Sequence, residues 1–376
     1  MKRLALVSPL PPARSGVAEF SKRVARELSR VVRVEARESG ERAWLEAADE
    51  RLYQIGNNAL HSGAYEAALA VPGVVELHDA VLHHFLLGRL SREKYVEEIV
   101  YSGGEWERGM AEELWLRRGD ASSDAGFFAR PLLRRVVESA RAVIVHNPGA
   151  LRRVREARSQ AGVAQPMFEI PHYVDPPEVV SAEEVAQARR ELGLDEGDLL
   201  ISCFGFQRPP RRLRSVLRVV KRLARPVKLL VAGAFVSVEY EQALAPLLGS
   251  DRVVRLPFLS ERELAIYAAS TDVCVNLRSP SAGETSGIAV KLMARGKPVV
   301  VTDSEEVSAF PNDAVVGIDS GEAEEEMLAE ALQALLADAG LREAIGAAAA
   351  RHIRVRHGFE AVLPLYLEAL GLTDVS

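Results

Sequence analysis

Short apolar runs alternate with helical patterns along most of the chain. In the first half, the runs with the length of buried strands are LALV, RLYQIG, GVVELHD, AVIVHN and MFEIP. In the second half, they are LLISCFGF, KLLVAGAF, RVVRL, DVCVNL and PVVVTD. Strands that alternate with helices are typical of βαβ units and parallel sheets. The pattern therefore predicts an α/β fold with two Rossmann-like, doubly wound domains.

The same pattern divides the chain into parts. It predicts an N-terminal domain over residues 1–175, with a longer and mostly helical insertion at residues 91–139. Residues 190–355 predict a C-terminal domain. We expect the linker in the polar, Pro-containing stretch at residues 175–197. The apolar pattern of residues 356–376 predicts a last helix that packs against a domain surface.

Composition limits the classes of function. A chain of 376 residues suits two domains better than one core. The net charge of −6 gives no general attraction to nucleic acid, so we expect no nucleic-acid partner. The chain holds seven Lys and forty Arg, so an Arg within a motif is weaker evidence here than in an average protein.

Cysteines and apolar segments indicate the compartment. Cys203 and Cys274 lie in apolar runs and predict buried core residues, because their spacing fits neither a disulfide framework nor a zinc site. The first apolar run is too short for a signal peptide, and no stretch approaches the roughly 18 apolar residues of a membrane span. We expect a cytoplasmic protein, with room for peripheral contact with the inner membrane.

Glycines and polar residues follow the predicted strands in both halves. Ligands of open parallel sheets bind beyond the carboxyl ends of the strands, so this pattern predicts two domains that face each other across one cleft. In the first half, the residues are Gly16, Asn57, Asn58, His61, His78, His146 and His172. In the second half, they are Gly205, Arg208, Arg211, Arg212, Gly233 and Glu284.

Several of these residues, and Asp79 directly after His78, also have a purely structural interpretation. Gly16 could simply begin a helix, and Asp79 could cap the helix that follows it. His146 and His172 could be buried core residues. In the long Arg run, only the first members precede the helix, where a phosphate would meet both guanidinium groups and a helix N-terminus.

Familiar catalytic motifs are absent from the sequence. There is no G-x-G-x-x-G after either first strand, no P-loop, no G-x-S-x-G elbow and no H-E-x-x-H or Cys/His metal spacing. We therefore expect a phosphate-bearing ligand held by Arg and helix N-termini, with acid and imidazole groups from the opposite domain, and no metal or other cofactor.

A set of strings resembles one family over nearly the whole chain. FGF-x(4)-RRL, SPSAGETSG and GKPVVVTD, together with SPLPPxRSGVA, GNNxxH and LHDxxLHH, are similar to the GT-B-type retaining glycosyltransferases (family 4-like, group 1). The resemblance implies a nucleotide-diphosphate-sugar donor mostly on the C-terminal domain. It also implies a saccharide or other hydroxyl acceptor mostly on the N-terminal domain, and a last helix that crosses back to that domain.

The resemblance also implies roles for single residues. Glu284 stands where the first Glu of an E-x(7)-E element contacts the hydroxyls of the donor sugar, and Arg211 stands where a Lys contacts the donor diphosphate. His78 would bind the transferred sugar, and Gly16 would let the backbone approach the donor. The amides that meet the phosphates would be those of Thr285, Ser286 and Gly287. We expect further donor contacts from Gly205, Arg208, Arg212 and Gly233, and contacts on the sugar and acceptor side from Asn57, Asn58, His61, His146 and His172.

The chain departs from the family pattern in two places. Phe206 stands where an Arg commonly follows the glycine, and the second Glu, which usually holds the nucleotide ribose, is missing. Leu292 is eight residues after Glu284, and its neighbour Lys291 is no carboxylate. We expect a retaining hexosyltransferase. A sugar-nucleotide epimerase of the same fold and a non-catalytic nucleotide-sugar-binding protein remain alternatives, and a Rossmann-type oxidoreductase is disfavoured by the missing glycine pattern.

Overall fold

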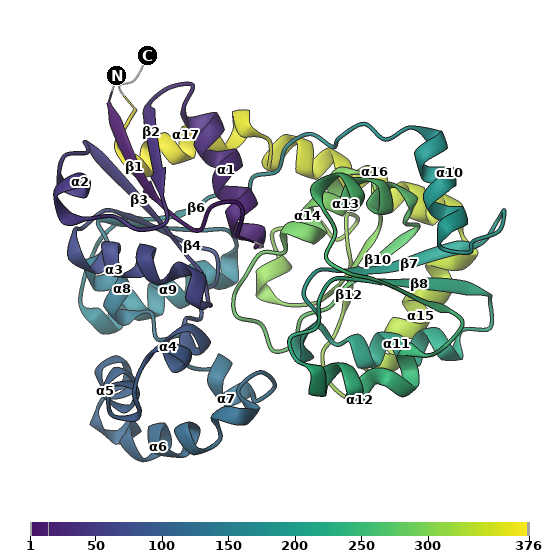
Figure 1. Cartoon of the computed structure of the whole chain (residues 1–376), viewed down its shortest axis with the longest axis horizontal. Helices are drawn as coiled ribbons and strands as arrows, with labels where there is room; N and C mark the ends of the chain where they lie inside the picture. The colour runs from purple at the N-terminus through teal and green to yellow at the C-terminus, as the bar shows by residue number, and fades with distance from the viewer. Residues whose placement is uncertain (1, 14, 374–376) are drawn as a thin grey trace. The chain divides into compact units, whose positions relative to one another are not determined.

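The computed structural model describes residues 2–13 and 15–373 and divides the chain into two compact units. Each unit contains one six-stranded parallel sheet (Figure 1). The first unit consists of Met1–Asp175, Pro280–Thr285 and His357–Ser376, and the second of Pro176–Ser279 and Ser286–Arg356. The loop that carries Glu284 and the last helix of the chain therefore belong to the first unit.

The sheet of the first unit has the strand order β2-β1-β3-β4-β5-β6. All of its pairings are parallel, and its inner strands are largely apolar because helices cover both faces. The strands are β1 (Arg3–Val7), β2 (Arg33–Arg37), β3 (Glu50–Ile55), β4 (Val74–Leu77), β5 (Ala142–Val145) and β6 (Met167–Glu169).

Alternate residues of these strands point to two separate cores. On one face, Leu6, Leu52 and Ile144 pack with α1 (Gly16–Leu28) and α17 (Phe359–Leu370), which lie together in Figure 1. The other face is covered by α3 (Ser62–Ala70), α8 (Arg134–Ser139) and α9 (Pro148–Ala161), and α2 (Arg42–Glu46) precedes β3. The apolar pattern of the last helix thus completes the core of the first unit.

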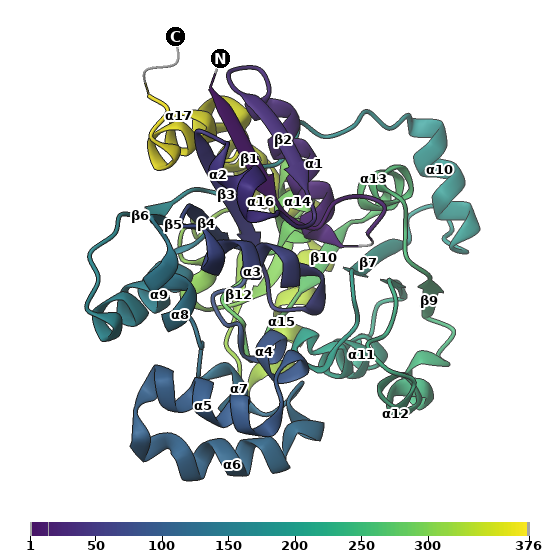
Figure 2. The same cartoon turned by 60° about the vertical axis from the view of Figure 1, so that its left-hand side comes forward.

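A helical insertion separates β4 from α8. It begins with α4 (His83–Arg89), and its other helices form a layer of their own beyond α4 in both views (Figures 1 and 2). They are α5 (Arg92–Gly103), α6 (Arg108–Leu116) and α7 (Ala125–Phe128). Tyr95, Leu114 and Phe127 join the insertion to the core on the α3 side of the sheet.

The sheet of the second unit has the order β12-β11-β10-β7-β8-β9 and is also parallel throughout. Its core packs against α11 (Leu213–Arg222), α12 (Val238–Leu248) and α15 (Glu324–Ala337). On β10 and β11 lies α14 (Gly287–Ala294), which also contacts α16 (Ala339–Arg356). The strands are β7 (Leu199–Phe204), β8 (Val227–Ala232), β9 (Val253–Leu256), β10 (Val273–Asn276), β11 (Val299–Thr302) and β12 (Val316–Ile318).

The stretch predicted as a linker contributes a helix of its own, α10 (Ala182–Glu191). Its start is fixed by a capping box between Ser181 and Glu184. Arg189 donates to Asp272 and to the Ser270 carbonyl at the end of α13 (Glu261–Ser270). Arg262 of α13 also pairs with Glu184, so a pattern too polar for a core helix is held in place by capping and by charged side chains.

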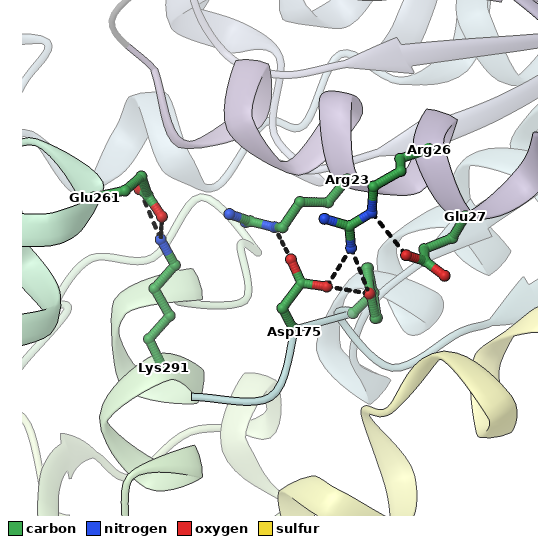
Figure 3. Close-up of polar contacts among 7 residues, drawn as sticks. Arg23, Arg26, Glu27, Asp175, Glu261 and Lys291 are labelled. Atoms are coloured by element: carbon green, nitrogen blue, oxygen red, sulfur yellow. Dashed lines mark hydrogen bonds and ion pairs between the residues drawn. The ribbon is translucent and has the colours of Figure 1, made fainter. Parts of the chain in front are cut away.

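At Asp175, where the chain first leaves the first unit, the backbone is held by side-chain and backbone contacts. Arg26 of α1 donates to the Asp175 carboxylate at 2.5 Å, and the Nε of Arg23 lies 4.0 Å from the same group (Figure 3). One residue earlier, the Val174 amide donates to the carbonyl of His357, where the chain returns to the first unit. The outgoing and returning segments are therefore hydrogen-bonded to each other.

Two further expectations concern burial. Cys203 and Cys274 are buried and free, as predicted. Within the described residues, no helix combines the length and the apolar character that a membrane crossing requires.

Candidate active site

Three histidines gather where β4, β5 and β6 end. His78, His146 and His172 are all buried, and their ring centroids lie 4.9, 5.5 and 4.5 Å from that of Phe20 on α1. The rings of His78 and His146 are 5.1 Å apart. The structure therefore brings together three of the residues predicted for the sugar and acceptor side, since carboxyl ends of parallel strands meet at one edge.

A buried carboxylate lies beside this cluster, and sequence reasoning did not find it. Oε1 of Glu76 is 3.3 Å from Nε2 of His146 and accepts the hydroxyl of Tyr366, while Oε2 accepts the amide of Gln54 at 2.8 Å. Burial acts to raise the pKa of Glu76, but the hydrogen bonds and charges of its neighbours outweigh burial and lower that pKa.

Glu76, His78 and His146 also bring three potential ligand atoms within 4.8 Å of one another, as no other group of described residues does. Both oxygens of the carboxylate already accept hydrogen bonds from protein donors. We therefore assign no metal to this group.

The other predicted residues of the first unit are tied into local structure. Burial lowers the pKa of His61 to about 4, and its Nδ1 donates to the Gln54 carbonyl. Asn58 caps a short 3₁₀ turn by accepting from Leu60. The side chain of Asn57 accepts from the Phe85 amide and so connects the end of β3 to α4.

The structure corrects the role predicted for Asp79. The N-cap of α4 is Leu82, and no side chain caps that helix. Asp79 accepts instead from the backbone amide of Asn57 at 2.8 Å. A Cβ at Gly56 would lie 2.9 Å from the Asp79 carboxylate and 2.8 Å from His61, so these side chains leave room only for a glycine.

The Glu284 loop is fastened to the ends of β4 and β5. The side-chain amide of Asn147 donates to the Gly283 carbonyl at 3.1 Å and to the Thr285 hydroxyl at 2.9 Å, and that hydroxyl donates to the carbonyl of His146. Gly283 has a φ of +78°, and a Cβ there would lie 2.8 Å from the Cβ of Ala80. The loop therefore lies at the same edge of the sheet as the histidines.

The carboxylate of Glu284 is oriented by its own loop. It accepts from the Ala282 amide at 2.9 Å and from the Ser281 hydroxyl at 3.4 Å, and its side chain is half-buried. An ionised carboxylate can accept hydrogen bonds from hydroxyls, which is the task that the family resemblance implies for Glu284.

We expect Gly283→Ala to reduce activity through the loop. A left-handed conformation costs a residue with a side chain about 1–2 kcal/mol, and the added methyl group would press on Ala80. Turnover should fall and the melting temperature should drop. Gly109→Ala, at a helical position with no atom within 4 Å, is the matched control and should leave both unchanged. Wild-type turnover in Gly283→Ala would contradict this account.

In the second unit, Arg211 lies over the end of β7. Gly205, directly after β7, has a φ of +98°, and a Cβ there would lie 3.1 Å from Nη2 of Arg211 and 3.9 Å from Ile288 in the first turn of α14. A bare backbone, a guanidinium and a helix N-terminus thus lie side by side. Backbone amides, Arg and helix starts are the groups that bind phosphate in proteins.

The start of α14 is defined by Ser286, whose hydroxyl accepts from the Ala289 amide. The helix therefore begins at Gly287, so the amides of Ser286 and Gly287 lie at its N-terminus. The side chain of Thr285, in contrast, is used by the first unit through Asn147 and His146.

Other predicted donor residues have structural tasks that sequence reasoning missed. Nε of Arg212 donates to both oxygens of the buried Glu324, at 2.9 and 2.8 Å. Arg212 has a φ of +55° and directly precedes α11. A Cβ at Gly233 would lie 2.2 Å from the carbonyl oxygen of Gly205, so the close approach of two backbones requires this glycine. Arg208 precedes the 3₁₀ turn Pro209–Arg211.

Gly16 is the first residue of α1, whose N-cap is Ser15, and no atom lies within 4 Å of the Cβ position of Gly16. The structural interpretation of Gly16 as the start of a helix is therefore confirmed. It is compatible with a close approach of a ligand to this backbone.

The departures from the family pattern are visible in α14 as well. Leu292 is fully buried, so the position eight residues after Glu284 faces the core. Nζ of Lys291 donates to both oxygens of Glu261, at 2.9 and 2.7 Å (Figure 3). Phe206 is 51% exposed beside Gly205.

Comparisons with known proteins give one family model and a set of solved structures. Residues 199–338 match the family model of the glycosyl transferases group 1, a range that includes Gly205, Arg211 and Glu284. No curated protein matches the chain.

Solved structures share the fold at low sequence identity. Sucrose-phosphate synthase from Thermosynechococcus elongatus matches with a TM-score of 0.68 and 16% identity over 100% of both chains. Anabaena HepE in complex with UDP matches with a TM-score of 0.65 and 15% identity, and WaaG, a glycosyltransferase involved in lipopolysaccharide biosynthesis, with 0.61 and 14%. Each of these two matches covers 99% of this chain and 100% of the other. The likenesses confirm the predicted α/β fold of the GT-B type.

Proposed function

We propose that this chain, of which residues 199–338 match the glycosyl transferases group 1 and which has the GT-B fold, transfers a hexose from a nucleotide-diphosphate-sugar to a hydroxyl acceptor with retention of configuration. One observation carries the donor class: Arg211 lies over the bare backbone of Gly205, beside the N-terminus of α14. Structures of Anabaena HepE with UDP and with UDP-glucose support the same class.

In this proposal, each charged or polar group has one task. Arg211 and the first amides of α14 stabilise the departing diphosphate, and removal of one such preorganised donor commonly costs about 3 kcal/mol. Glu284 accepts hydroxyls of the sugar, and His78 contacts the sugar near the anomeric carbon. A diphosphate oxygen accepts the proton of the attacking acceptor hydroxyl. The oxygen of that hydroxyl then bonds to the anomeric carbon, on the face that the diphosphate leaves.

We further propose that the transfer requires no metal ion, because guanidinium and helix amides supply the positive charge that the diphosphate needs. Turnover that persists after EDTA treatment would support this. Turnover that EDTA abolishes and magnesium restores would contradict it.

A screen of nucleotide-sugars by thermal shift tests the donor class. A ligand at about 100 times its dissociation constant stabilises a protein by about 2.7 kcal/mol. The donor found in this way is then incubated with candidate acceptors, and the anomeric configuration of the product is read by NMR. Inversion would contradict retention, a new sugar-nucleotide formed without acceptor would show an epimerase, and an unaltered donor would indicate a binding protein.

We expect His78→Gln to reduce turnover and to leave the affinity for the bare nucleoside diphosphate unchanged, because only the sugar reaches this side chain. Turnover with the donor and calorimetry with the nucleoside diphosphate measure the two quantities. His352→Gln, on α16 of the second unit, is the control for histidine loss. Equal losses in both measurements, or a loss of stability alone, would contradict a sugar contact.

A further inference from the structure

Apolar side chains are exposed where three neighbouring strands of the second sheet end. The strands β7, β8 and β9 lie next to one another, so the loops that follow them meet at one edge of the sheet. Phe206 follows β7 and is 51% exposed, Val236 follows β8 and is 46% exposed, and Phe258 follows β9 and is 50% exposed. Among the 11 phenylalanines of the chain, all of which lie within the described residues, only these two are exposed. We call Phe206, Val236 and Phe258 the apolar patch.

The exposure of Phe206 follows from the backbone around it. The amide of Gln207 donates to the Ala234 carbonyl at 2.8 Å, and the amide of Val236 donates to the Gln207 carbonyl at 2.9 Å. The side chain of Gln207 is buried and donates to the Gly205 carbonyl at 2.8 Å. Successive side chains of a strand-like segment point to opposite sides, so the buried Gln207 turns its neighbour Phe206 towards the solvent.

This arrangement is the reverse of what burial alone would favour. An amide is costly to bury and a phenyl ring is costly to expose, yet the loop buries Gln207 and exposes Phe206. Phe235, in the loop after β8, shows the ordinary outcome, because it is half-buried and the guanidinium of Arg255 lies 5.4 Å from the centroid of its ring. Aromatic surface that a loop leaves exposed at the edge of a parallel sheet indicates a binding surface.

The apolar patch adjoins the group that we assign to the diphosphate. Phe206 directly follows Gly205, where a Cβ would lie 3.1 Å from Nη2 of Arg211 and 3.9 Å from Ile288 of α14. The sheet order places α14 over β10 and β11, on one side of β7, and the patch over β8 and β9, on the other side. A ligand whose phosphates bind beside Arg211 and α14 therefore reaches the patch with the part that lies beyond its phosphates.

The chemistry of the patch selects one part of a nucleotide-sugar. The sugar and the ribose present hydroxyls, and the diphosphate presents charge, whereas the base presents a flat ring. Bases stack on aromatic side chains whatever their identity, because every base has a π-face. Since α14, with the sequence GIAVKLMA, contains no carboxylate that could hold ribose hydroxyls, contacts with the base become more important for binding the nucleoside.

We propose that Phe206, with Val236 and Phe258 in the neighbouring loops, is the stacking surface for the base of a nucleoside diphosphate. The assignment rests on the proposed function, which supplies the nucleotide, and adds the residues that hold the nucleoside. The diphosphate is bound by a guanidinium and helix amides, and the base by apolar contact. The two parts of the binding site can therefore be removed independently by mutation.

Calorimetry with the full chain measures the two parts separately. The ligands are UDP, ADP, GDP and inorganic pyrophosphate, which carries the charge of a diphosphate without a nucleoside. We expect the wild-type protein to bind at least one nucleoside diphosphate more tightly than pyrophosphate. Phe206→Ser should weaken that nucleoside diphosphate about 5- to 150-fold, the size of one base–aromatic stack, and leave pyrophosphate unchanged. Phe258→Ser should weaken the same nucleoside diphosphate, and Arg211→Ala should weaken both kinds of ligand.

Two further variants test whether the ring itself binds the base. Phe206→Trp keeps an aromatic face and should retain the affinity for the nucleoside diphosphate, whereas a loss as large as that in Phe206→Ser would overturn stacking. Trp106→Ser is the matched control, because this aromatic residue is 83% exposed but belongs to the insertion of the first unit. It should change neither affinity. The melting temperature of Phe206→Ser should stay at the wild-type value, since the ring lies at the surface.

The outcomes distinguish this proposal from the proposed function. If Phe206→Ser binds the nucleoside diphosphate as tightly as the wild-type protein, or if the wild-type protein prefers no nucleoside diphosphate to pyrophosphate, stacking fails and the diphosphate site stands. Unchanged affinity in Phe258→Ser would overturn the part assigned to Phe258. If the wild-type protein binds none of the ligands, the donor class itself fails, and stacking fails with it. A wild-type dimer that Phe206→Ser dissociates without a change in affinity would show that a second copy covers the patch, and would overturn the proposal.

Discussion

Glu284→Ala should abolish most transfer while the protein stays folded. The carboxylate is fixed by the Ala282 amide and the Ser281 hydroxyl in a loop that hydrogen bonds attach to the ends of the strands. A hydrogen bond to a charged group contributes about 1.5–3 kcal/mol, so kcat/KM for the nucleotide-sugar should fall about 10- to 150-fold, and further if two hydroxyls are held. Initial rates with the donor measure this effect.

Two controls separate the loss of the acceptor from the loss of the loop. Ser281→Ala removes two contacts of the turn, to Glu284 and from the Gly283 amide, but leaves the carboxylate of Glu284, so its activity should fall much less than that of Glu284→Ala. Affinity for the bare nucleoside diphosphate should not change in Glu284→Ala, because no sugar is present to meet the carboxylate. Near wild-type turnover in Glu284→Ala would remove Glu284 from the active site.

Arg211→Ala should weaken the binding of the nucleoside diphosphate by about 1.5–3 kcal/mol, which is about 10- to 150-fold in the dissociation constant. The guanidinium lies over Gly205 beside the start of α14, where a diphosphate gains from charge and from helix amides together. Calorimetry with the nucleoside diphosphate measures the effect, and donor turnover should fall as well.

The neighbouring arginines serve as controls for this prediction. Arg214→Ala changes an exposed side chain of the same run, on α11, and should leave affinity unchanged. Arg211→Lys keeps the charge at a position where the family resemblance implies a Lys, and should retain most of the binding. Unchanged affinity in Arg211→Ala would move the role to Arg208 or Arg212, although the latter already holds Glu324.

The inner strands of both sheets could be predicted from the sequence, whereas the edge strands β2 and β12 could not. Strands covered on both faces are continuous apolar runs, as in AVIV of β5 and VVVT of β11. The edge strand β2, RVEAR, is half-exposed and carries three charged residues, so it lacks an apolar run. The edge strand β12, VGI, was missed for another reason, since it is only three residues long and contains a glycine.

The predicted cap at Asp79 failed for a related reason. The sequence places Asp79 just before a helix, where a cap is the local interpretation. The Asn57 amide, which arrives from the neighbouring strand β3, takes the carboxylate instead. Rules that consider only residues close in the sequence cannot identify a partner that the sheet brings in from another strand.

Glu76 shows how such a residue could have been noticed. It interrupts the apolar run VVELHD, and Gln54 interrupts RLYQIG in the same way. Polar side chains inside strands buried on both faces require partners, so the two interruptions indicate a buried polar contact. The third partner, Tyr366, lies 290 residues further along the chain and could not be inferred from spacing.

The membership of α17 in the first unit has a consequence for biosynthesis. Its Val362, Tyr366 and Leu370 fill the core that α1 and the first sheet leave open. These residues are translated after the second unit, so the apolar face of the first sheet stays uncovered while the second unit is being made. Domains usually mature in the order of synthesis. In this chain, the first unit is begun before the second unit and completed after it, so the apolar face of its sheet waits for α17.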